Sequence, residues 1–173
     1  DIMALRTMPN NIEAEKSVLG ACFLSKYALQ KACESLDEEK FYDEKNSKIF
    51  HAMKNLQEQK TPVDLTTLTS ELQKGNQLNE VGGVEYLTEI LNFVPVATNV
   101  DYYIKSVEDT AILRNLIDTA SNIATEGYNQ TEDINQTLDD AERKILNIVK
   151  NRKSSEFKSI QEVMTNAEAN FEK

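Results

Sequence analysis

The sequence predicts an all-α protein: a small globular helical bundle, a long antiparallel helical hairpin and a separate linker helix, in that order. Apolar residues recur three and four positions apart along most of the chain, which is the spacing of one face of a helix. The β-branched residues are scattered and do not alternate with polar ones, so strand signals are scarce. Only three prolines and five glycines interrupt the 173 residues, which leaves room for long helices.

The globular bundle is expected to span residues 10–97, after residues 1–9, which we interpret as a disordered tail or an expression-vector remnant. Its first helix begins at the Pro9 turn, where Asn10 and Glu13 have the spacing of a capping box. Short polar side chains that suit the N-cap position precede each of the next three helices. These residues are Ser25, Asp43 and Asp64.

Glycine and proline predict where the later helices of the bundle end. Gly75 follows the fourth apolar stripe and is expected to stop that helix. The Gly82–Gly83 pair permits a tight turn before a short fifth helix. That helix is expected to end before Pro95, because the residue that precedes a proline is disfavoured in helical geometry.

Residues 98–151 are predicted to form the helical hairpin. Neither proline nor glycine occurs from Thr98 to Glu126, and a helix of about 28 residues would be about 42 Å long. Gly127 is expected to close this helix, and the next helix is expected to begin near Asp133. Two long helices joined by so short a turn must run antiparallel.

The hairpin carries more apolar surface than one seam requires. Leu113, Leu116 and Ile117 spread around the first helix, so part of this surface is expected to face another chain. The alternative is that the hairpin folds back and buries these residues internally. Residues 98–150 carry ten acids and five bases, so the polar face suits solvent or a basic protein partner.

After the hairpin, residues 152–158 are polar and basic, and we interpret them as a linker, with a frayed helix end as the alternative. Ser159 and Glu162 then form a capping-box pair at the start of a linker helix over 159–173. About 15 residues are too few for a stable isolated helix, so its apolar stripe is expected to dock on another surface. The docking residues are Ile160, Val163, Met164 and Phe171.

Composition and motifs argue against several classes of function. The 29 acidic and 19 basic residues give a net charge of −10, which disfavours a dedicated nucleic-acid binder. Neither a phosphate-binding G-x-x-x-x-G-K-[ST] loop nor a G-x-G-x-x-G pattern occurs, so no nucleotide cofactor is expected in these residues.

Catalytic and metal sites are not expected either. His51, Cys22 and Cys33 do not have the spacing of a zinc site, and the two cysteines suggest a reducing compartment. A hydrolase with His51 as its base is a remote third possibility, and a solvated histidine on a helix face is the preferred interpretation. No membrane span or signal peptide is expected, so we expect a cytoplasmic protein.

The order of short motifs along the chain resembles that of the DnaB-type bacterial replicative DNA helicases. The opening run from Pro9 to Gly20, P-N-N-I-E-A-E-K-S-V-L-G, is similar to the opening of that family. Each later motif is weak alone, but their number and order make chance similarity improbable. They are Phe41-Tyr42, Ile49-Phe50, Pro62-Val63-Asp64-Leu65, Val81-Gly82-Gly83, Val94-Pro95, Tyr102-Tyr103, Leu113-Arg114, Asp140-Ala141-Glu142-Arg143 and Phe157-Lys158-Ser159-Ile160. Asn46 and Asn115 depart from the family pattern, which often has His and Arg there, and we expect the departures to affect surface contacts only.

The resemblance implies a place for this chain within a larger machine. Family members have an amino-terminal helical domain, a hairpin, a linker helix and then a RecA-like motor, which holds ATP and Mg²⁺ and accounts for most DNA contact. The chain would be the first three parts, without catalysis of its own. Hairpins would pair between subunits, three such pairs would form a collar on a hexameric ring, and the linker helix would pack against the neighbouring motor. The collar would bind primase, a loader is a further possible partner, and the site of action would be the replisome at the nucleoid.

The same resemblance, taken with the spacing of the hairpin residues, suggests a primase-facing surface formed by Tyr86, Ile117 and Ile123. Ordinary core packing is the alternative for each. The rival function is a stand-alone helical adaptor, such as the helicase-binding domain of a primase or a loader-like regulator.

Overall fold

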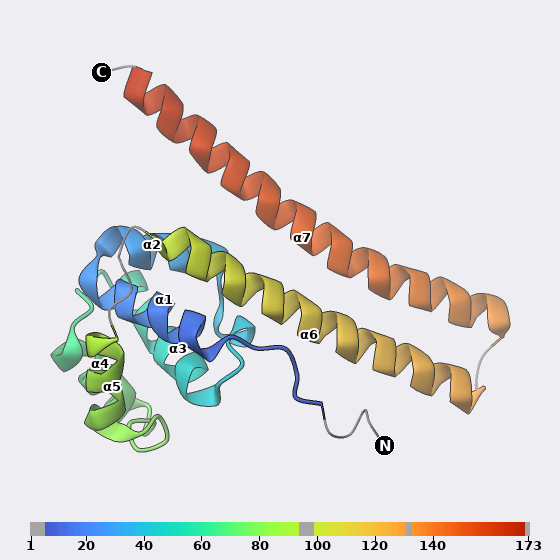
Figure 1. The fold of residues 1–173 in the computed structure, drawn as a ribbon, viewed down its shortest axis with the longest axis horizontal. Coiled ribbons are helices and arrows are strands. Elements are labelled where there is room, and N and C mark those ends of the chain that lie inside the picture. The colour runs from blue at the N-terminus through green and yellow to red at the C-terminus, as the bar shows by residue number, and fades with distance from the viewer. Residues whose placement is uncertain (1–5, 94–98, 131–132, 172–173) are drawn as a thin grey trace. The chain divides into compact units, whose positions relative to one another are not determined.

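The computed structural model describes residues 6–93, 99–130 and 133–171, and every regular element in these ranges is a helix (Figure 1). The predicted all-α fold is confirmed. The chain divides into two compact units, residues 1–111 and 112–173. The elements are α1 (Ile12–Leu24), α2 (Lys26–Ser35), the 3-10 helix η2 (Glu38–Lys40), α3 (Glu44–Glu58), α4 (Leu65–Lys74), α5 (Gly83–Asn92), α6 (Val100–Asn129) and α7 (Ile134–Phe171).

Local capping chemistry sets the starts of the helices in the first unit. The side chains of Ser25, Asp43 and Asp64 accept hydrogen bonds from backbone N–H groups in the first turns of α2, α3 and α4, as predicted. The cap of α1 differs by one residue, because Asn11 accepts from the Ala14 N–H at 3.0 Å. Asn10 instead donates to the carbonyl oxygen of a tail residue, so it does not begin a capping box.

The ordered part of the N-terminal segment is longer than predicted. Residues 1–5 lie outside the described residues, but Arg6 to Pro9 are placed, and Met8 and Pro9 are partly buried. The Asn10 amide donates to the Met8 carbonyl oxygen at 2.9 Å, which stabilises this turn. The expectation of a disordered tail therefore does not hold for the four residues before Asn10.

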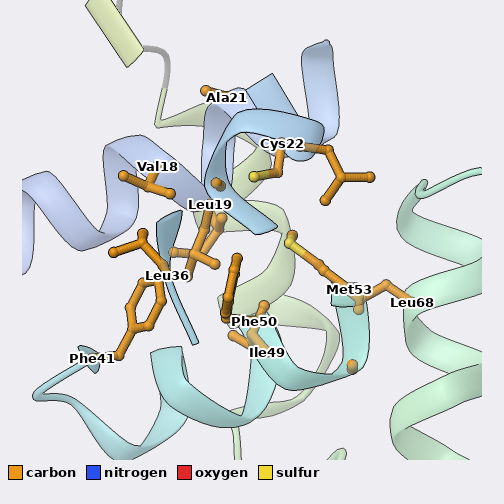
Figure 2. Close-up of a cluster of buried hydrophobic side chains, with 14 of the residues drawn as sticks. Val18, Leu19, Ala21, Cys22, Leu36, Phe41, Ile49, Phe50, Met53 and Leu68 are labelled. Atoms are coloured by element: carbon orange, nitrogen blue, oxygen red, sulfur yellow. The ribbon is translucent and has the colours of Figure 1, made fainter. Parts of the chain in front are cut away.

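The core of the first unit lies where α1, α2, α3, α4 and α5 converge. Helix α1 packs on α2, α3 and α5, and α4 packs on both α3 and α5. Figure 2 shows side chains from several of these helices pointing into one cluster, with the rings of Phe41 and Phe50 4.9 Å apart between centroids. The largest fully buried side chains are Leu19, Ile49, Phe50, Met53, Leu68, Leu72, Leu87 and Ile90. Each contributes roughly 1.5–3 kcal/mol through burial of apolar area.

A buried polar cluster ties α1, α3 and α5 together inside this apolar core. The Glu15 carboxylate is 1 % exposed and accepts hydrogen bonds from the Tyr42 N–H at 2.9 Å and the Asp43 N–H at 3.3 Å. The Asn46 amide donates to the same carboxylate at 3.0 Å, and the Tyr86 hydroxyl donates to the Asn46 amide oxygen at 2.5 Å. A buried charge is tolerated only when its oxygens are paired, and these donors supply that pairing.

The first unit also contains the start of α6, which moves the boundary from the predicted residue 98. Val100, Ile104 and Val107 belong to the same buried cluster as the five shorter helices. The Asn11 amide donates to the Ser106 hydroxyl at 2.8 Å, which joins the first turn of α1 to α6. The fold therefore assigns residues 100–111 of α6 to the globular bundle and the rest of the helix to the hairpin.

Helix α6 is longer than predicted, because Gly127 does not end it. The helix continues to Asn129, and the left-handed residue after it is Gln130, with φ of 50°. The Gln130 N–H bonds to the Glu126 carbonyl oxygen at 3.3 Å. Glycine costs a helix only about 1 kcal/mol relative to alanine, so the neighbouring helix formers carry α6 through this position.

Helix α7 replaces the predicted linker and separate linker helix. It runs without a break from Ile134 to Phe171, so residues 152–158 and 159–171 are both helical. No proline or glycine occurs after Gly127, and lysine, arginine and glutamate favour helix, so a polar composition alone did not interrupt α7. With no interruption, Ser159 lies inside the helix and does not act as its N-cap.

We predict that Asn46→Ala destabilises the first unit more than an ordinary surface substitution does. It removes a donor from the buried Glu15 carboxylate and the acceptor of the Tyr86 hydroxyl, which costs about 2–4 kcal/mol. Thermal unfolding followed by circular dichroism should show a melting temperature lower by about 10 °C. Glu58→Ala, at an exposed position of the same helix, is the control and should leave it nearly unchanged. Equal melting temperatures for the two variants would contradict the structural role of the cluster.

Candidate protein interface on the helical hairpin

Large apolar side chains are concentrated on the exposed surface of the second unit. Each of them is at least 37 % exposed, in contrast to the buried core of the first unit. Contiguous apolar surface of this kind marks a contact site more often than a bare solvent face. The residues are Leu113, Leu116, Ile117, Tyr128, Ile134, Leu138, Ile145, Leu146 and Val149.

The two helices of the second unit run antiparallel, as predicted, and are joined by a short turn (Figure 1). The Lys144 ammonium forms an ion pair with the Glu126 carboxylate, which brings α7 against α6 at this position. Half-buried residues recur at helical spacing on both helices, and the Glu126–Lys144 ion pair places these two faces toward each other. We call this set the seam, and its members are Ile112, Thr119, Ile123 and Glu126 on α6 and Thr137, Ala141, Lys144 and Ile148 on α7.

Helix α6 has a second apolar stripe beside this seam. Leu113, Ile117, Ala120 and Ala124 follow one another at intervals of four, three and four residues, and all are exposed. This spacing places them on one face of the helix, roughly a third of a turn from the seam. The seam therefore covers only part of the apolar sector of α6.

Helix α7 has a matching stripe. Ile134, Leu138, Ile145 and Val149 recur at intervals of four, seven and four residues and are between 37 % and 70 % exposed. They lie about a quarter of a turn from the residues that face α6.

The two open stripes lie on the same side of the hairpin. On each helix the open stripe is turned from the seam in the same rotational sense when the helix is viewed from its own N-terminus. Because the helices run in opposite directions, equal rotations bring both stripes to one side. The hairpin therefore presents one continuous apolar face, hereafter the open hairpin face, which α6 and α7 cannot bury against each other.

The structure separates the three predicted primase-facing residues. Ile117 lies on the open hairpin face and is 40 % exposed, whereas Ile123 is half-buried in the seam. Tyr86 belongs to the core of the first unit, where only 8 % of it is exposed. Of the three, only Ile117 is exposed.

Tyr86 is held on several sides by its own unit. Its hydroxyl bonds to Asn46, and the Lys45 ammonium lies 4.3 Å from the centre of its ring. Burial raises the pKa of the Tyr86 phenol, so the hydroxyl remains a donor at neutral pH. A Cβ at Gly82, where φ is +92°, would come within 2.9 Å of the Tyr86 Cβ, so this close approach requires glycine.

The role of Asn46 differs from the sequence-based expectation of a surface contact. It is fully buried and links Glu15 to Tyr86. Its distance in sequence from both partners, 31 and 40 residues, explains why the sequence alone did not indicate the link. The periodicity of α3 does place Asn46 with the buried Ile49, Phe50 and Met53, which was the available signal.

The predicted docking residues of the linker helix lie in the last part of α7. Met164 is 60 % exposed. The side chains of Ile160, Val163 and Phe171 lie outside the described residues, so their docking role remains a prediction.

The residues with catalytic potential do not form a reactive site. The His51 imidazole is about half-exposed and lies 3.3 Å from a Glu38 carboxylate oxygen. Burial raises the pKa of both thiols, that of Cys33 to about 11, which leaves them protonated at neutral pH. Among the described residues, no three histidine, cysteine or carboxylate side chains are grouped as metal ligands. No described helix has the length and apolarity that a bilayer crossing requires.

We predict that Ile117→Ser leaves the melting temperature within about 2 °C of the unchanged chain, because the side chain is 40 % exposed and supports no core. Val107→Ser is the comparison, since Val107 is fully buried and its loss should cost about 2–4 kcal/mol. Thermal melts should be recorded at concentrations where dilution no longer shifts the transition. A large loss of stability in Ile117→Ser would instead assign this residue to a core.

Comparison with known proteins agrees with this fold. The model of the DnaB-like helicase N-terminal domain matches residues 7–109. The replicative DNA helicase DnaB of Geobacillus stearothermophilus is 44 % identical over 172 residues, covering 99 % of this chain and 38 % of the relative. The chain thus spans well under half the length of such relatives.

Solved structures show the same architecture. The N-terminal domain of DnaB helicase from Mycobacterium tuberculosis superposes with a TM-score of 0.75 at 30 % identity, covering 82 % of this chain and 99 % of that one. A DnaB-like replicative helicase, described together with its interactions with primase, gives a TM-score of 0.66 at 25 % identity, covering 80 % of this chain and 31 % of that one. The matched residues, the shared helical fold and the identity over nearly the whole chain show that this chain belongs to the DnaB-like helicase N-terminal domain family.

Proposed function

We propose that this chain is the assembly and partner-binding region of a replicative DNA helicase and that it works by joining subunits and recruiting primase. The observation that carries this proposal is the open hairpin face, which displays apolar side chains that the chain's own helices do not cover. Family membership supports the setting at the replication fork, because relatives that match nearly the whole chain are replicative helicases.

A second copy of the chain is the occupant that best fits the open hairpin face. The face is apolar along both helices, and an identical face on another copy is equally apolar, so pairing would complete a four-helix bundle. Burial of Leu138, Ile145 and Val149 in such a bundle would remove their side chains from water. Three pairs would give the hexameric ring that the sequence resemblance implies.

Primase is the second proposed partner. The support is the likeness to a DnaB-like replicative helicase whose interactions with primase are described. Ile117 is the proposed contact, and because it lies on the open hairpin face, primase would bind it where pairing with a second copy leaves it uncovered. Ile123 and Tyr86 would act mainly by positioning, since the seam and the core hold them. The end of α7, with Ile160, Val163, Met164 and Phe171, is proposed to dock on a neighbouring subunit.

Catalysis is assigned to other parts of the whole helicase. The 173 residues contain no phosphate-binding loop of the G-x-x-x-x-G-K-[ST] type, so they do not fit ATP with Mg²⁺. ATP hydrolysis and most DNA contact would belong to a motor domain, as in the family that the sequence resembles. The helicase would act in the cytoplasm, where the chromosome is copied.

We predict that Leu138→Gln combined with Ile145→Gln weakens self-association by at least about tenfold in Kd, because two exposed apolar side chains per copy lose their burial. Sedimentation equilibrium over a range of concentrations measures this. Asn122→Gln combined with Asn147→Gln is the matched control, since both asparagines are exposed and lie off the open stripes. A chain that is monomeric at every concentration would disprove the self-association.

We predict that Ile117→Ser reduces binding of the helicase-binding domain of the cognate primase by about tenfold or more, while the melting temperature is unchanged. Isothermal titration calorimetry measures the affinity. Tyr27→Ser is the control, because Tyr27 is a 58 % exposed aromatic residue that belongs to the first unit. Unchanged primase binding by Ile117→Ser would exclude this residue from the contact.

A further inference from the structure

Positive charge is concentrated in one short part of α7, although the chain as a whole is acidic. Residues 143–155 contain five bases and no acid, whereas residues 115–142 contain seven acids and no lysine or arginine. These five are more than a quarter of the 19 bases in the chain, which has 29 acids. The net charge of −10 therefore conceals a local basic segment in the middle of α7.

Arg143 and Lys150 share one face of this segment. They are seven residues apart, an interval that returns to the same side of an α-helix, and both are exposed. Asn147 lies between them and is exposed and uncharged. The sequence continues the same spacing at Ser154 and Lys158, which also belong to α7. We refer to Arg143, Lys150, Ser154 and Lys158 as the basic stripe, which is about 22 Å long at a rise of about 1.5 Å per residue.

The basic stripe lies away from the surface proposed for self-association. By the helical period, it is turned about a third of a turn from the seam residues of α7 and nearly half a turn from Leu138, Ile145 and Val149. A second copy on the open hairpin face would therefore leave the basic stripe uncovered. The stripe is thus available to a ligand in a single copy and in a pair of copies alike.

Acidic neighbours limit the basic stripe at its N-terminal end only. Asp139 precedes Arg143 by one turn, and the Asp140 carboxylate is bonded to the Arg143 guanidinium at 2.9 Å. The Arg143 side chain is 68 % exposed, and an ion pair this open to solvent is weak, so an anion can displace it. Within the described ranges, Lys150 takes part in no ion pair. Glu156, the next acid in the sequence, falls near the opposite side of the helix by the same periodicity.

We propose that the basic stripe binds the phosphate backbone of DNA, as a contact additional to the assembly role of the chain. Arginine and lysine aligned along one helix are the electrostatic footprint of nucleic-acid binding, and serine hydroxyls add neutral donors to phosphate oxygens. Arg143 and Lys150 are about 10 Å apart along the helix axis, which matches about three phosphates of a strand whose repeat is about 3.4 Å. Contacts of this kind do not read base sequence, so the binding is expected to be non-specific.

An acidic protein is the alternative ligand, and the composition of the basic stripe favours DNA. Protein interfaces are held by apolar or aromatic anchors at their centre, and the residues of the stripe include none. A phosphate backbone requires only positive charge and hydrogen-bond donors. The proposal rests on the proposed function in one respect, since the setting in a DNA helicase is what brings DNA to this chain.

Fluorescence anisotropy of the full 173-residue chain tests the proposal with two probes, a labelled oligodeoxythymidylate of about 20 nucleotides and a duplex of the same length. Arg143→Gln combined with Lys150→Gln should raise the Kd at low salt by about tenfold or more. The salt dependence gives a second measure, because each lost phosphate contact reduces the slope of log K against log salt by about 0.7 for a single strand and about 0.9 for a duplex. The probe whose slope changes identifies the form of DNA that the stripe binds.

Lys26→Gln combined with Lys74→Gln is the matched control, since it removes two exposed positive charges from the first unit. It should leave both the Kd and the slope nearly unchanged. Equal weakening by the two double variants, or no binding of either probe by the unaltered chain, would overturn the proposal. Polyglutamate that binds the unaltered chain, is lost in the stripe variant and is not displaced by DNA would assign the stripe to an acidic protein and overturn it as well.

Sedimentation equilibrium separates this proposal from the proposed function. The Arg143/Lys150 variant should self-associate like the unaltered chain, because the substituted residues lie away from the open hairpin face. If self-association is observed while neither probe binds, the assembly role stands and only the DNA contact fails.

Discussion

Helices α6 and α7 contact each other along one seam, and this seam can cover only one face of each helix. This constraint governs the second unit, because α6 and α7 each carry an apolar stripe beside the mixed stripe that forms the seam, and the seam leaves the apolar stripe uncovered. The uncovered stripes fall on the same side only because the helices are antiparallel. The short turn and the Glu126–Lys144 ion pair therefore hold the helices in the arrangement that places both open stripes on one side. The proposed assembly function depends on this single apolar face.

The first unit, unlike the second, has an apolar core of its own and pairs its buried polar groups internally. Its buried apolar side chains form one cluster around α1, and the Glu15 carboxylate receives hydrogen bonds from α3 and the segment before it. Tyr86 is held in the same cluster, so a substitution there would disturb the interior first and a partner second. The first unit, whose buried polar groups are paired, therefore provides stability. The second unit, whose apolar stripes are uncovered, provides the surface for the proposed association.

Features that depend on neighbouring residues were predictable from the sequence. The caps at Ser25, Asp43 and Asp64 and the start of α7 at Ile134 depend on side chains within a few positions of the helix end. Features that depend on distant residues were not predictable, such as the Glu15–Asn46–Tyr86 cluster, which joins three helices. The continuity of α7 through residue 152 was also missed, because the polar residues there do not break a helix. The spacing of the hairpin residues indicated that part of their apolar surface is exposed, as Ile117 is, while the burial of Tyr86 in the bundle required the structure.

Gly127 lies in the last turns of α6 with no neighbouring atom within 4 Å of where a side chain would begin. The backbone there lacks the conformational restriction that a side chain gives, which costs the helix about 1 kcal/mol relative to alanine. Because an added Cβ would meet no neighbour, an alanine at this position would recover that stability without a clash.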